Sequence, residues 1–205
     1  MGRYDMVVKT LSIIGTAGRK DDGRRLTKES FSKMYRVAEE LVRQLSVDNS
    51  VLLMSGGAAW ADHTAVQLFL NKKVSGIYLY LPCEFRSGKF YDEMEYESAA
   101  DTINYYHKLF SKTAEIDSLR DIKRAISEGA IVECGGGFKG RNTKISKADV
   151  LLAMTFGYKD VVKEGGTADT VRKYLFRCKR EHYVNTSYHY NLAEDRIYTG
   201  VLAPM

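Results

Sequence analysis

The stretch RNTKISKADVLLAMTF occupies residues 141–156, and GGTADT follows it at residues 165–170. It combines a basic residue, Arg141, with an apolar run suited to a buried strand and a glycine turn that opens a helix. Glycines between a strand and a helix let backbone N–H groups approach a ligand, and the helix dipole favours an anion there. The stretch therefore predicts a strand of a parallel sheet and an anion cradle at the start of the following helix.

Two further apolar runs end in glycine turns. Residues 10–15 lead into Gly15-Thr-Ala-Gly18, and residues 51–54 lead into Ser55-Gly-Gly-Ala58. Helical periodicity alternates with these runs, which is the pattern of a mostly parallel sheet with helices on both faces. We therefore expect an α/β, Rossmann-like single domain over residues 1–205. In such sheets ligands bind beyond the carboxyl ends of the strands, so the three glycine loops should gather at one edge.

The composition is that of an ordinary globular chain. A net charge of +5 over 205 residues permits anionic partners but does not by itself indicate nucleic-acid binding. The cysteines Cys83, Cys134 and Cys178 lie far apart without metal-binding spacing, which is typical of reduced thiols and predicts no metal site. Because no apolar run suits a signal peptide or a membrane span, we expect a cytoplasmic protein that binds no membrane.

Two segments do not fit the alternating pattern. Residues 83–100 mix aromatic and acidic side chains without a clear period, and we expect a long excursion over the edge of the sheet. The tail from about residue 183 is rich in Tyr and Asn, and we expect it to be irregular.

The three glycine loops provide candidate ligand-binding residues. Each loop has an alternative interpretation as a plain strand-to-helix turn or a helix cap. Arg19 and Arg141 are the candidate phosphate clamps, because a guanidinium holds a phosphate through two parallel hydrogen bonds. The full candidate set for ligand and phosphate binding is Gly15, Thr16, Arg19, Ser55, Gly56, Gly57, Arg141, Gly165, Gly166, Thr167 and Thr170.

Three side chains outside the glycines allow two interpretations each. Asp62, in the first turns of a helix, could accept hydrogen bonds from ribose hydroxyls or could offset the helix dipole. Trp60 could stack on a base or belong to the core. His107 could transfer protons, although a single helical histidine is more often structural.

Taken together, these motifs resemble the Rossmann-like SLOG superfamily, which includes DprA-type, YpsA-type and LOG proteins. Ser55-Gly-Gly-Ala-Ala-Trp-Ala-Asp62 is similar to the superfamily's S-G-G-A-x-G-x-D turn. Arg141-Asn142, the strand that follows and Gly165-Gly-Thr-Ala-Asp-Thr170 are similar to its R-N/K, strand and G-G-T-x-x-T segments. The resemblance spans roughly residues 10–178 and implies a fold that binds a nucleotide or nucleotide-derived ligand, with no further cofactor.

Within that superfamily, the LOG branch hydrolyses the N-glycosidic bond of nucleoside monophosphates with an arginine and a glutamate. Arg141 matches the arginine, but Thr170 stands where that branch has the glutamate, and Trp60 replaces a glycine of the superfamily turn. We therefore expect binding of a nucleoside phosphate or an NAD-derived metabolite, closer to the YpsA branch. The alternatives are N-glycosidic hydrolysis, with Asp62, Arg141, Glu164 and Asp169 as candidate catalytic residues, and DNA binding as in the DprA branch. The LOG resemblance also suggests a homodimer.

Overall fold

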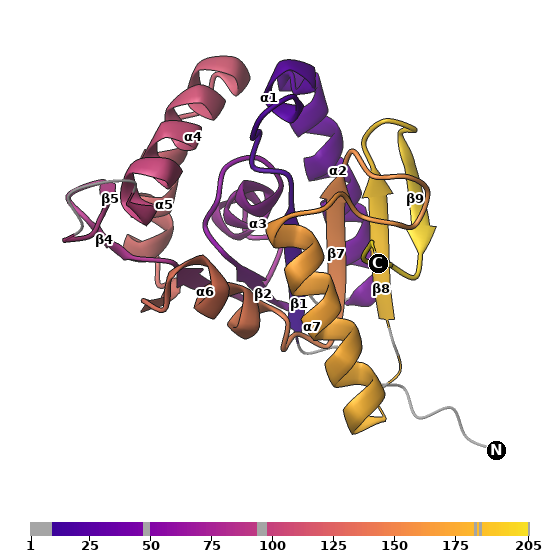
Figure 1. The fold of residues 1–205 in the computed structure, drawn as a ribbon. Coiled ribbons are helices and arrows are strands. Elements are labelled where there is room, and N and C mark those ends of the chain that lie inside the picture. Colours follow the sequence, from indigo (N-terminus) through magenta and orange to yellow (C-terminus); the bar gives the residue numbers. More distant parts are fainter. Residues whose placement is uncertain (1–9, 47–49, 94–97, 183, 185, 205) are drawn as a thin grey trace.

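The structure is a computed structural model that describes residues 10–46, 50–93, 98–182, 184 and 186–204. A seven-stranded sheet in the order β6-β3-β2-β1-β7-β8-β9 is parallel except for β9, and β4 and β5 form a separate hairpin. The elements in chain order are β1 (Thr10–Gly15), α1 (Asp22–Arg25), α2 (Lys28–Leu45), β2 (Leu52–Ser55), α3 (Ala61–Leu70), β3 (Gly76–Leu81), β4 (Glu84–Arg86), β5 (Lys89–Tyr91), α4 (Ala99–Ala114), α5 (Ser118–Ser127), β6 (Ile131–Cys134), α6 (Gly137–Ile145), β7 (Val150–Thr155), α7 (Gly166–Glu181), β8 (Thr186–Asn191) and β9 (Arg196–Thr199). The expected Rossmann-like fold class is confirmed (Figure 1).

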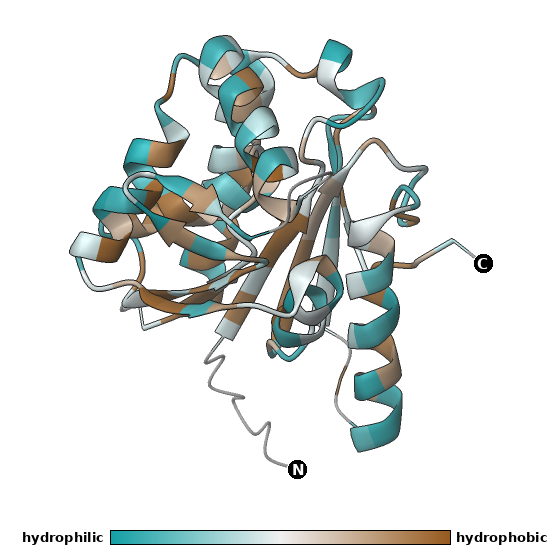
Figure 2. Cartoon of the chain, turned by 60° about the vertical axis from the view of Figure 1, so that its left-hand side comes forward, coloured by the Kyte–Doolittle hydropathy of each residue, from teal (hydrophilic) through white to brown (hydrophobic). Residues whose placement is uncertain are grey.

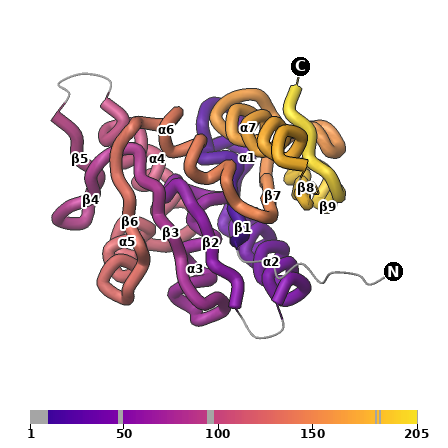
Figure 3. Tube along the Cα trace, turned by 90° about the horizontal axis from the view of Figure 1, so that it is seen from below, coloured from indigo at the N-terminus to yellow at the C-terminus, as the bar shows by residue number. Residues whose placement is uncertain are grey.

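Helices cover both faces of the sheet because its central strands are apolar on both faces. In β1, Ile13 packs into the cluster that α2, α3, α4 and α5 share, whereas the next residue, Ile14, packs against α7. In β7, Leu152 belongs to the first cluster and Leu151 to the cluster against α7, because successive side chains on a strand point to opposite faces. Figure 3 shows α7 on one side of the strands and α2, α3 and α5 on the other, and Figure 2 shows hydrophobic strands between helices with hydrophilic outer faces.

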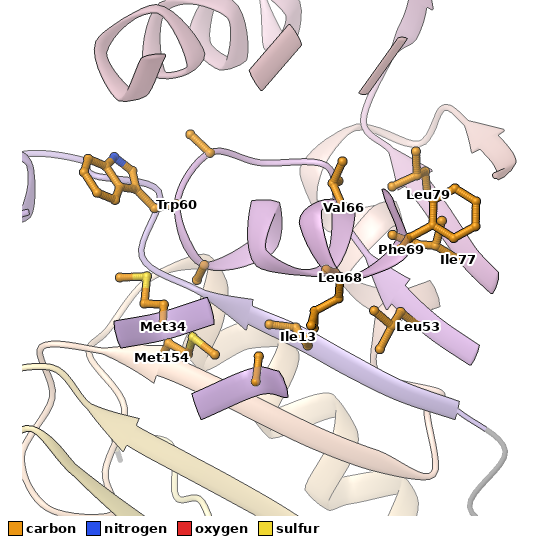
Figure 4. Packing of buried hydrophobic residues seen from close by; sticks show 14 of the residues in the cluster. Ile13, Met34, Leu53, Trp60, Val66, Leu68, Phe69, Ile77, Leu79 and Met154 are labelled. Atoms are coloured by element: carbon orange, nitrogen blue, oxygen red, sulfur yellow. The ribbon is translucent and has the colours of Figure 1, made fainter. Parts of the chain in front are cut away.

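The larger of the two clusters fixes α3 on the sheet. Leu68 of α3 lies among residues of β1, β2 and β3, including Ile13, Leu53 and Ile77 (Figure 4). All four side chains are essentially inaccessible to solvent. Because α3 follows the second glycine loop directly, this packing also fixes where that loop lies.

The expectation of an irregular tail from about residue 183 is wrong. β8 pairs in parallel with β7 along its whole length, and β9 returns antiparallel to it. The hydropathy pattern does not predict β8, because several of its buried residues are polar. His189 bonds to Thr155 Oγ1, and Asn191 Nδ2 donates to the carbonyl of Gly157, so their burial leaves these groups hydrogen-bonded.

The excursion over residues 83–100 contains the β4–β5 hairpin, and residues 94–97 lie outside the described residues. Its turn uses Ser87 and Gly88, both with positive φ, as two-residue hairpin turns of type I′ require. Asn104 of α4 holds the hairpin by accepting a hydrogen bond from the N–H of Phe90 and donating one to its carbonyl. Asn104 is therefore a structural residue.

Helix α6 was not expected from the sequence, and it changes the setting of Arg141. Instead of standing in a loop before the strand, Arg141 lies on a helix that begins after Gly136, a residue in the left-handed region. Only Asn142 and Ile145 of α6 are buried, so the helix lacks the apolar periodicity by which helices are recognised.

Candidate functional site

One pocket of about 790 Å³ lies at the carboxyl ends of β1 and β7. It sits where the strand order reverses direction, since β2 and β3 follow β1 on one side and β7 lies on the other. In Figure 1 this is the edge towards which the arrowhead of β7 points. The expectation that the three glycine loops gather at one edge is confirmed. The expected site residues that line the pocket are Gly15, Thr16, Arg19, Asp62, Arg141, Glu164, Gly165, Gly166, Thr167, Asp169 and Thr170.

The first glycine loop is held by side chains that bond within the protein. The hydroxyl of Thr16 donates to Oδ2 of Asp22 at 2.8 Å and accepts from the N–H of Gly18 at 3.1 Å. Asp22 is buried and also forms an ion pair with Lys163, which comes from the segment after β7. The hydroxyl proton of Thr16 is therefore already used, and Lys163 is a pocket cation that the sequence did not single out.

The second glycine loop is buried next to the pocket. Ser55 Oγ donates to the carbonyl of Asp62 at 3.0 Å and accepts from the N–H of Gly57, while the N–H of Gly56 donates to Oδ2 of Asp62 at 3.1 Å. These bonds tie the end of β2 to the start of α3. Asp62 lines the pocket, whereas Ser55, Gly56 and Gly57 are buried and do not line it.

Gly56 allows Asp62 and Arg141 to approach each other. A Cβ at Gly56 would lie 2.8 Å from both Cδ of Arg141 and Oδ2 of Asp62, closer than side chains tolerate. Burial is the largest influence on Asp62 and raises the pKa of its carboxyl, while Arg141 and backbone hydrogen bonds from Ala58 and Gly56 act in the opposite direction. The result is a buried carboxyl next to a half-buried guanidinium at the pocket wall.

The raised pKa of Asp62 predicts a specific pH dependence. Between its unfolded and folded pKa values the folded state binds more protons, so the free energy of unfolding should fall as the pH rises from about 4. Asp62→Asn keeps an oxygen for the N–H of Gly56 and removes the ionisation. We expect this variant to lack that part of the pH dependence in urea unfolding, whereas Asp101→Asn, at an exposed position, should retain it. Equal pH profiles for wild type and Asp62→Asn would contradict this prediction.

The third glycine loop presents the start of α7 to the pocket. Gly165 has φ +128°, a conformation that side chains rarely adopt, and it precedes the first helical residue, Gly166. Since the first N–H groups of a helix have no partner within it, those of Gly166 and Thr167 are available for an anion. The hydroxyl protons of this loop already have acceptors within the protein. Thr167 donates to the carbonyl of Gly15, and Thr170 donates to the carbonyl of Gly166. The expected cradle thus consists of amides rather than hydroxyls.

Asn142 joins the elements of the pocket, and the sequence did not single it out as a site residue. Its Oδ1 accepts from Nε and Nη2 of Arg141 at 3.3 and 3.1 Å. Its Nδ2 donates to the carbonyl of Gly166 and, at 2.9 Å, to Oδ2 of Asp169. Asn142 is buried, so it holds Arg141 at a fixed position beside the start of α7. Its place directly after Arg141 was the only signal in the sequence.

The two other candidate carboxylates are already paired. Glu164 is largely exposed and bonds to Arg172. Asp169 bonds to Lys173 and Asn142; burial raises its pKa, but these bonds and nearby positive charge outweigh burial and hold the pKa below its ordinary value. Of the three candidate carboxyl groups, only that of Asp62 is buried.

Arg19 lies at the wall of the pocket near two aromatic rings. Its guanidinium carbon is 5.4 Å from the ring centroid of Tyr106 in α4 and 5.0 Å from that of Phe138 in α6. Arg141 approaches the same Phe138 ring at 5.3 Å. Cation–π contacts of this kind hold a guanidinium in place and leave its N–H groups free to bind an anion.

Comparison with known proteins places the chain in a family. No family model matches the sequence. An uncharacterized protein of Acanthamoeba polyphaga mimivirus is 40% identical over 168 residues, which cover 80% of this chain and 89% of the viral protein. The chain belongs to the family of that viral protein. The name of this relative states no activity.

Trp60 belongs to the core of this family member rather than to its pocket wall. It is 3% exposed, and its ring contacts that of Phe110 edge to face at 4.8 Å. Its φ of +62° is strained for a tryptophan. Glycine adopts a positive φ freely, whereas Trp60 holds it at the cost of backbone strain.

His107 is a structural residue. It is fully buried, its two ring nitrogens bond to the carbonyl of Gly57 and to Ser118 Oγ at 2.9 Å each, and it does not line the pocket. Burial, followed by the nearby His63, lowers its pKa to about 3. The ring therefore supports the second glycine loop in its neutral form.

This burial predicts sensitivity to acid. Below the ordinary pKa of 6.5 the unfolded chain binds a proton at residue 107 that the folded state refuses down to about pH 3, so stability falls as the pH falls through this window. At about pH 5 the loss should be about 2 kcal/mol relative to neutral pH. His107→Gln should weaken this pH dependence in urea unfolding, whereas His182→Gln, at an exposed position, should preserve it. If the free energy of unfolding of His107→Gln depended on pH as steeply as that of the wild type, His107 would not be the source of the acid sensitivity.

Neither a cluster of metal-binding side chains nor a membrane-spanning helix is found among the described residues. Within them, no three His, Cys, Asp or Glu side chains form a group that could hold a metal ion. None of the helices in the described part of the chain has the length and apolar composition that a membrane span requires.

Proposed function

We propose that this protein binds a nucleoside phosphate or another nucleotide-derived ligand at the carboxyl edge of its sheet. The observation that carries the proposal is that the start of α7, Arg141, Arg19 and Asp62 all line one pocket. Its volume of about 790 Å³ is within the range of roughly 300–1,000 Å³ typical of small-molecule sites. The resemblance to the SLOG superfamily supports the same class of ligand.

The pocket offers a different partner for each part of a nucleotide. The amides of Gly166 and Thr167 suit a phosphate. Asn142 bonds both to Arg141 and to the carbonyl of Gly166, so it holds the guanidinium close enough to bind the same phosphate. The carboxyl of Asp62 suits the hydroxyls of a ribose, since an ionised carboxylate accepts hydrogen bonds. Phe138 and Tyr106 supply aromatic surface at the wall.

Calorimetric titration with a panel of nucleoside mono- and diphosphates tests the proposal. We expect saturable binding of at least one member at micromolar concentrations, and competition by inorganic phosphate. Arg120→Gln removes one positive charge from the exposed surface of α5 and should leave the affinity unchanged. Absence of binding across the whole panel would dispose of the proposed function.

A second candidate function is hydrolysis of an N-glycosidic bond, which the buried carboxyl of Asp62 favours. A carboxylate beside C1 of the sugar could activate water or stabilise positive charge that develops as the base leaves. Incubation with nucleoside monophosphates, followed by chromatography for the free base, distinguishes turnover from binding. Asp62→Asn should abolish release of base, whereas Glu164→Gln, at an exposed and paired position, should not.

A further inference from the structure

Two guanidinium groups lie on the wall of the pocket around one aromatic ring. Arg19 and Arg141 approach the Phe138 ring at 5.0 and 5.3 Å, although they come from a loop and a helix more than a hundred residues apart. The ring centroid of Tyr106 lies 5.4 Å from the guanidinium carbon of Arg19. Aromatic contacts thus favour these positions of both cations in the free protein.

The two positive charges act on each other. Burial lowers the pKa of Arg141, Asp62 raises it, and the charge of Arg19 lowers it again. Among the described residues neither guanidinium forms an ion pair with a carboxylate, and Arg141 donates to the neutral amide of Asn142 instead. Asp62 offsets part of the charge of Arg141, while Arg19 has no carboxylate partner among the described residues. An anionic ligand would relieve the repulsion that remains between the two guanidinium groups.

This pair of cations is distinct from the amides of α7 but adjacent to them. Arg141 bonds to Oδ1 of Asn142, and Nδ2 of the same side chain bonds to the carbonyl of Gly166. One amide side chain therefore spans the separation between the guanidinium and the first turn of α7. A second anionic group that binds the arginines would be the immediate neighbour of a phosphate on the helix.

We propose that the ligand carries two adjacent phosphoryl groups, one on the first amides of α7 and the other between Arg19 and Arg141. This inference rests on the proposed function and narrows it to nucleoside diphosphates or to dinucleotides with a bridging diphosphate. Arg19 then distinguishes diphosphates from monophosphates, and Arg141, beside both positions, contributes to the binding of either.

Paired titrations test this inference. The probes are AMP and ADP, GMP and GDP, CMP and CDP, and UMP and UDP, each without divalent cations, with NAD as a bridged diphosphate. For the nucleoside that binds, the diphosphate should bind at least about tenfold more tightly than the monophosphate, as one added charge-assisted contact implies. Arg19→Gln should remove most of that difference and leave the affinity for the monophosphate within about twofold. Arg120→Gln, which removes an exposed arginine on α5, should leave the difference intact.

The outcomes separate this inference from the proposed function. Equal affinity for mono- and diphosphate, or an Arg19→Gln variant that weakens both alike, would overturn the two-phosphoryl inference while nucleotide binding stands. Binding of NAD comparable to that of ADP, with the same dependence on Arg19, would identify a bridging diphosphate as the ligand group. Failure of every probe to bind would overturn both. Thermal unfolding of Arg19→Gln checks that the exposed substitution leaves the fold intact.

Discussion

Replacing Gly15 with alanine is expected to cost about 3 kcal/mol or more of folding free energy, an unusually large effect for one methyl group. The added Cβ would lie 2.1 Å from the carbonyl oxygen of Met154 and 2.7 Å from Cβ of Ala61. Both neighbours are held in place, Met154 by its pairing with β1 and Ala61 by the packing of α3. No side-chain rotation relieves the clash, so β1 has to separate from β7 or from α3.

Gly166→Ala is the matched control, because Gly166 lines the same pocket. A Cβ there has only Asn142 Nδ2 nearby, at 3.8 Å, and alanine favours a helix over glycine. We expect this variant to unfold in urea within about 0.5 kcal/mol of the wild type or to be slightly more stable. Equal losses of stability for the two variants would show that Gly15 is not constrained by its neighbours.

Replacing Arg141 with glutamine is expected to weaken binding of a nucleoside phosphate about a hundredfold. The guanidinium is half-buried, lies over Gly56 and is oriented by Asn142, so it offers its charge to a ligand without further ordering. Loss of a charge-assisted bidentate contact to phosphate accounts for an effect of this size. Calorimetric titration with the nucleotide that the panel identifies measures it.

The variant Arg141→Lys distinguishes the contribution of the positive charge at residue 141 from that of the planar guanidinium. Lysine keeps the positive charge beside the buried carboxyl of Asp62 but lacks the planar fork of the guanidinium. We expect near wild-type stability with an affinity about tenfold lower, whereas Arg141→Gln should also lose stability because Asp62 then lacks its cation. Wild-type affinity in both variants would exclude Arg141 from the ligand site.

The central strands could be predicted because they are buried on both faces. β1 and β7 appear as continuous apolar runs, and the glycine turns behind them mark their carboxyl ends. Helix α6 and strand β8 could not be predicted in this way. α6 buries only two side chains, and β8 buries His189 and Asn191, whose polarity is offset by hydrogen bonds to residues some thirty positions away.

Most of the predicted site residues line one pocket, but several of their polar groups bond to partners that the sequence did not predict. Glycine loops, Arg19, Arg141 and Asp62 follow from their positions relative to strands. The hydroxyls of Thr16 and Thr167, expected at the ligand, bond instead to Asp22 and to the carbonyl of Gly15. A hydroxyl donates to whichever acceptor lies nearest in space, and local sequence does not contain that information.

The sequence by itself determined the fold class and the edge of the sheet at which the glycine loops and the candidate site residues meet. These follow from local rules: apolar runs form buried strands, glycines permit close backbone approach, and helices begin with free N–H groups. Only the tertiary structure decided that Asp62 is buried beside Arg141, that Asn142 links Arg141 to α7, and that Arg19 and Arg141 share Phe138. Burial, charge and hydrogen bonding depend on distances between elements that lie far apart in the chain, and folding alone sets those distances.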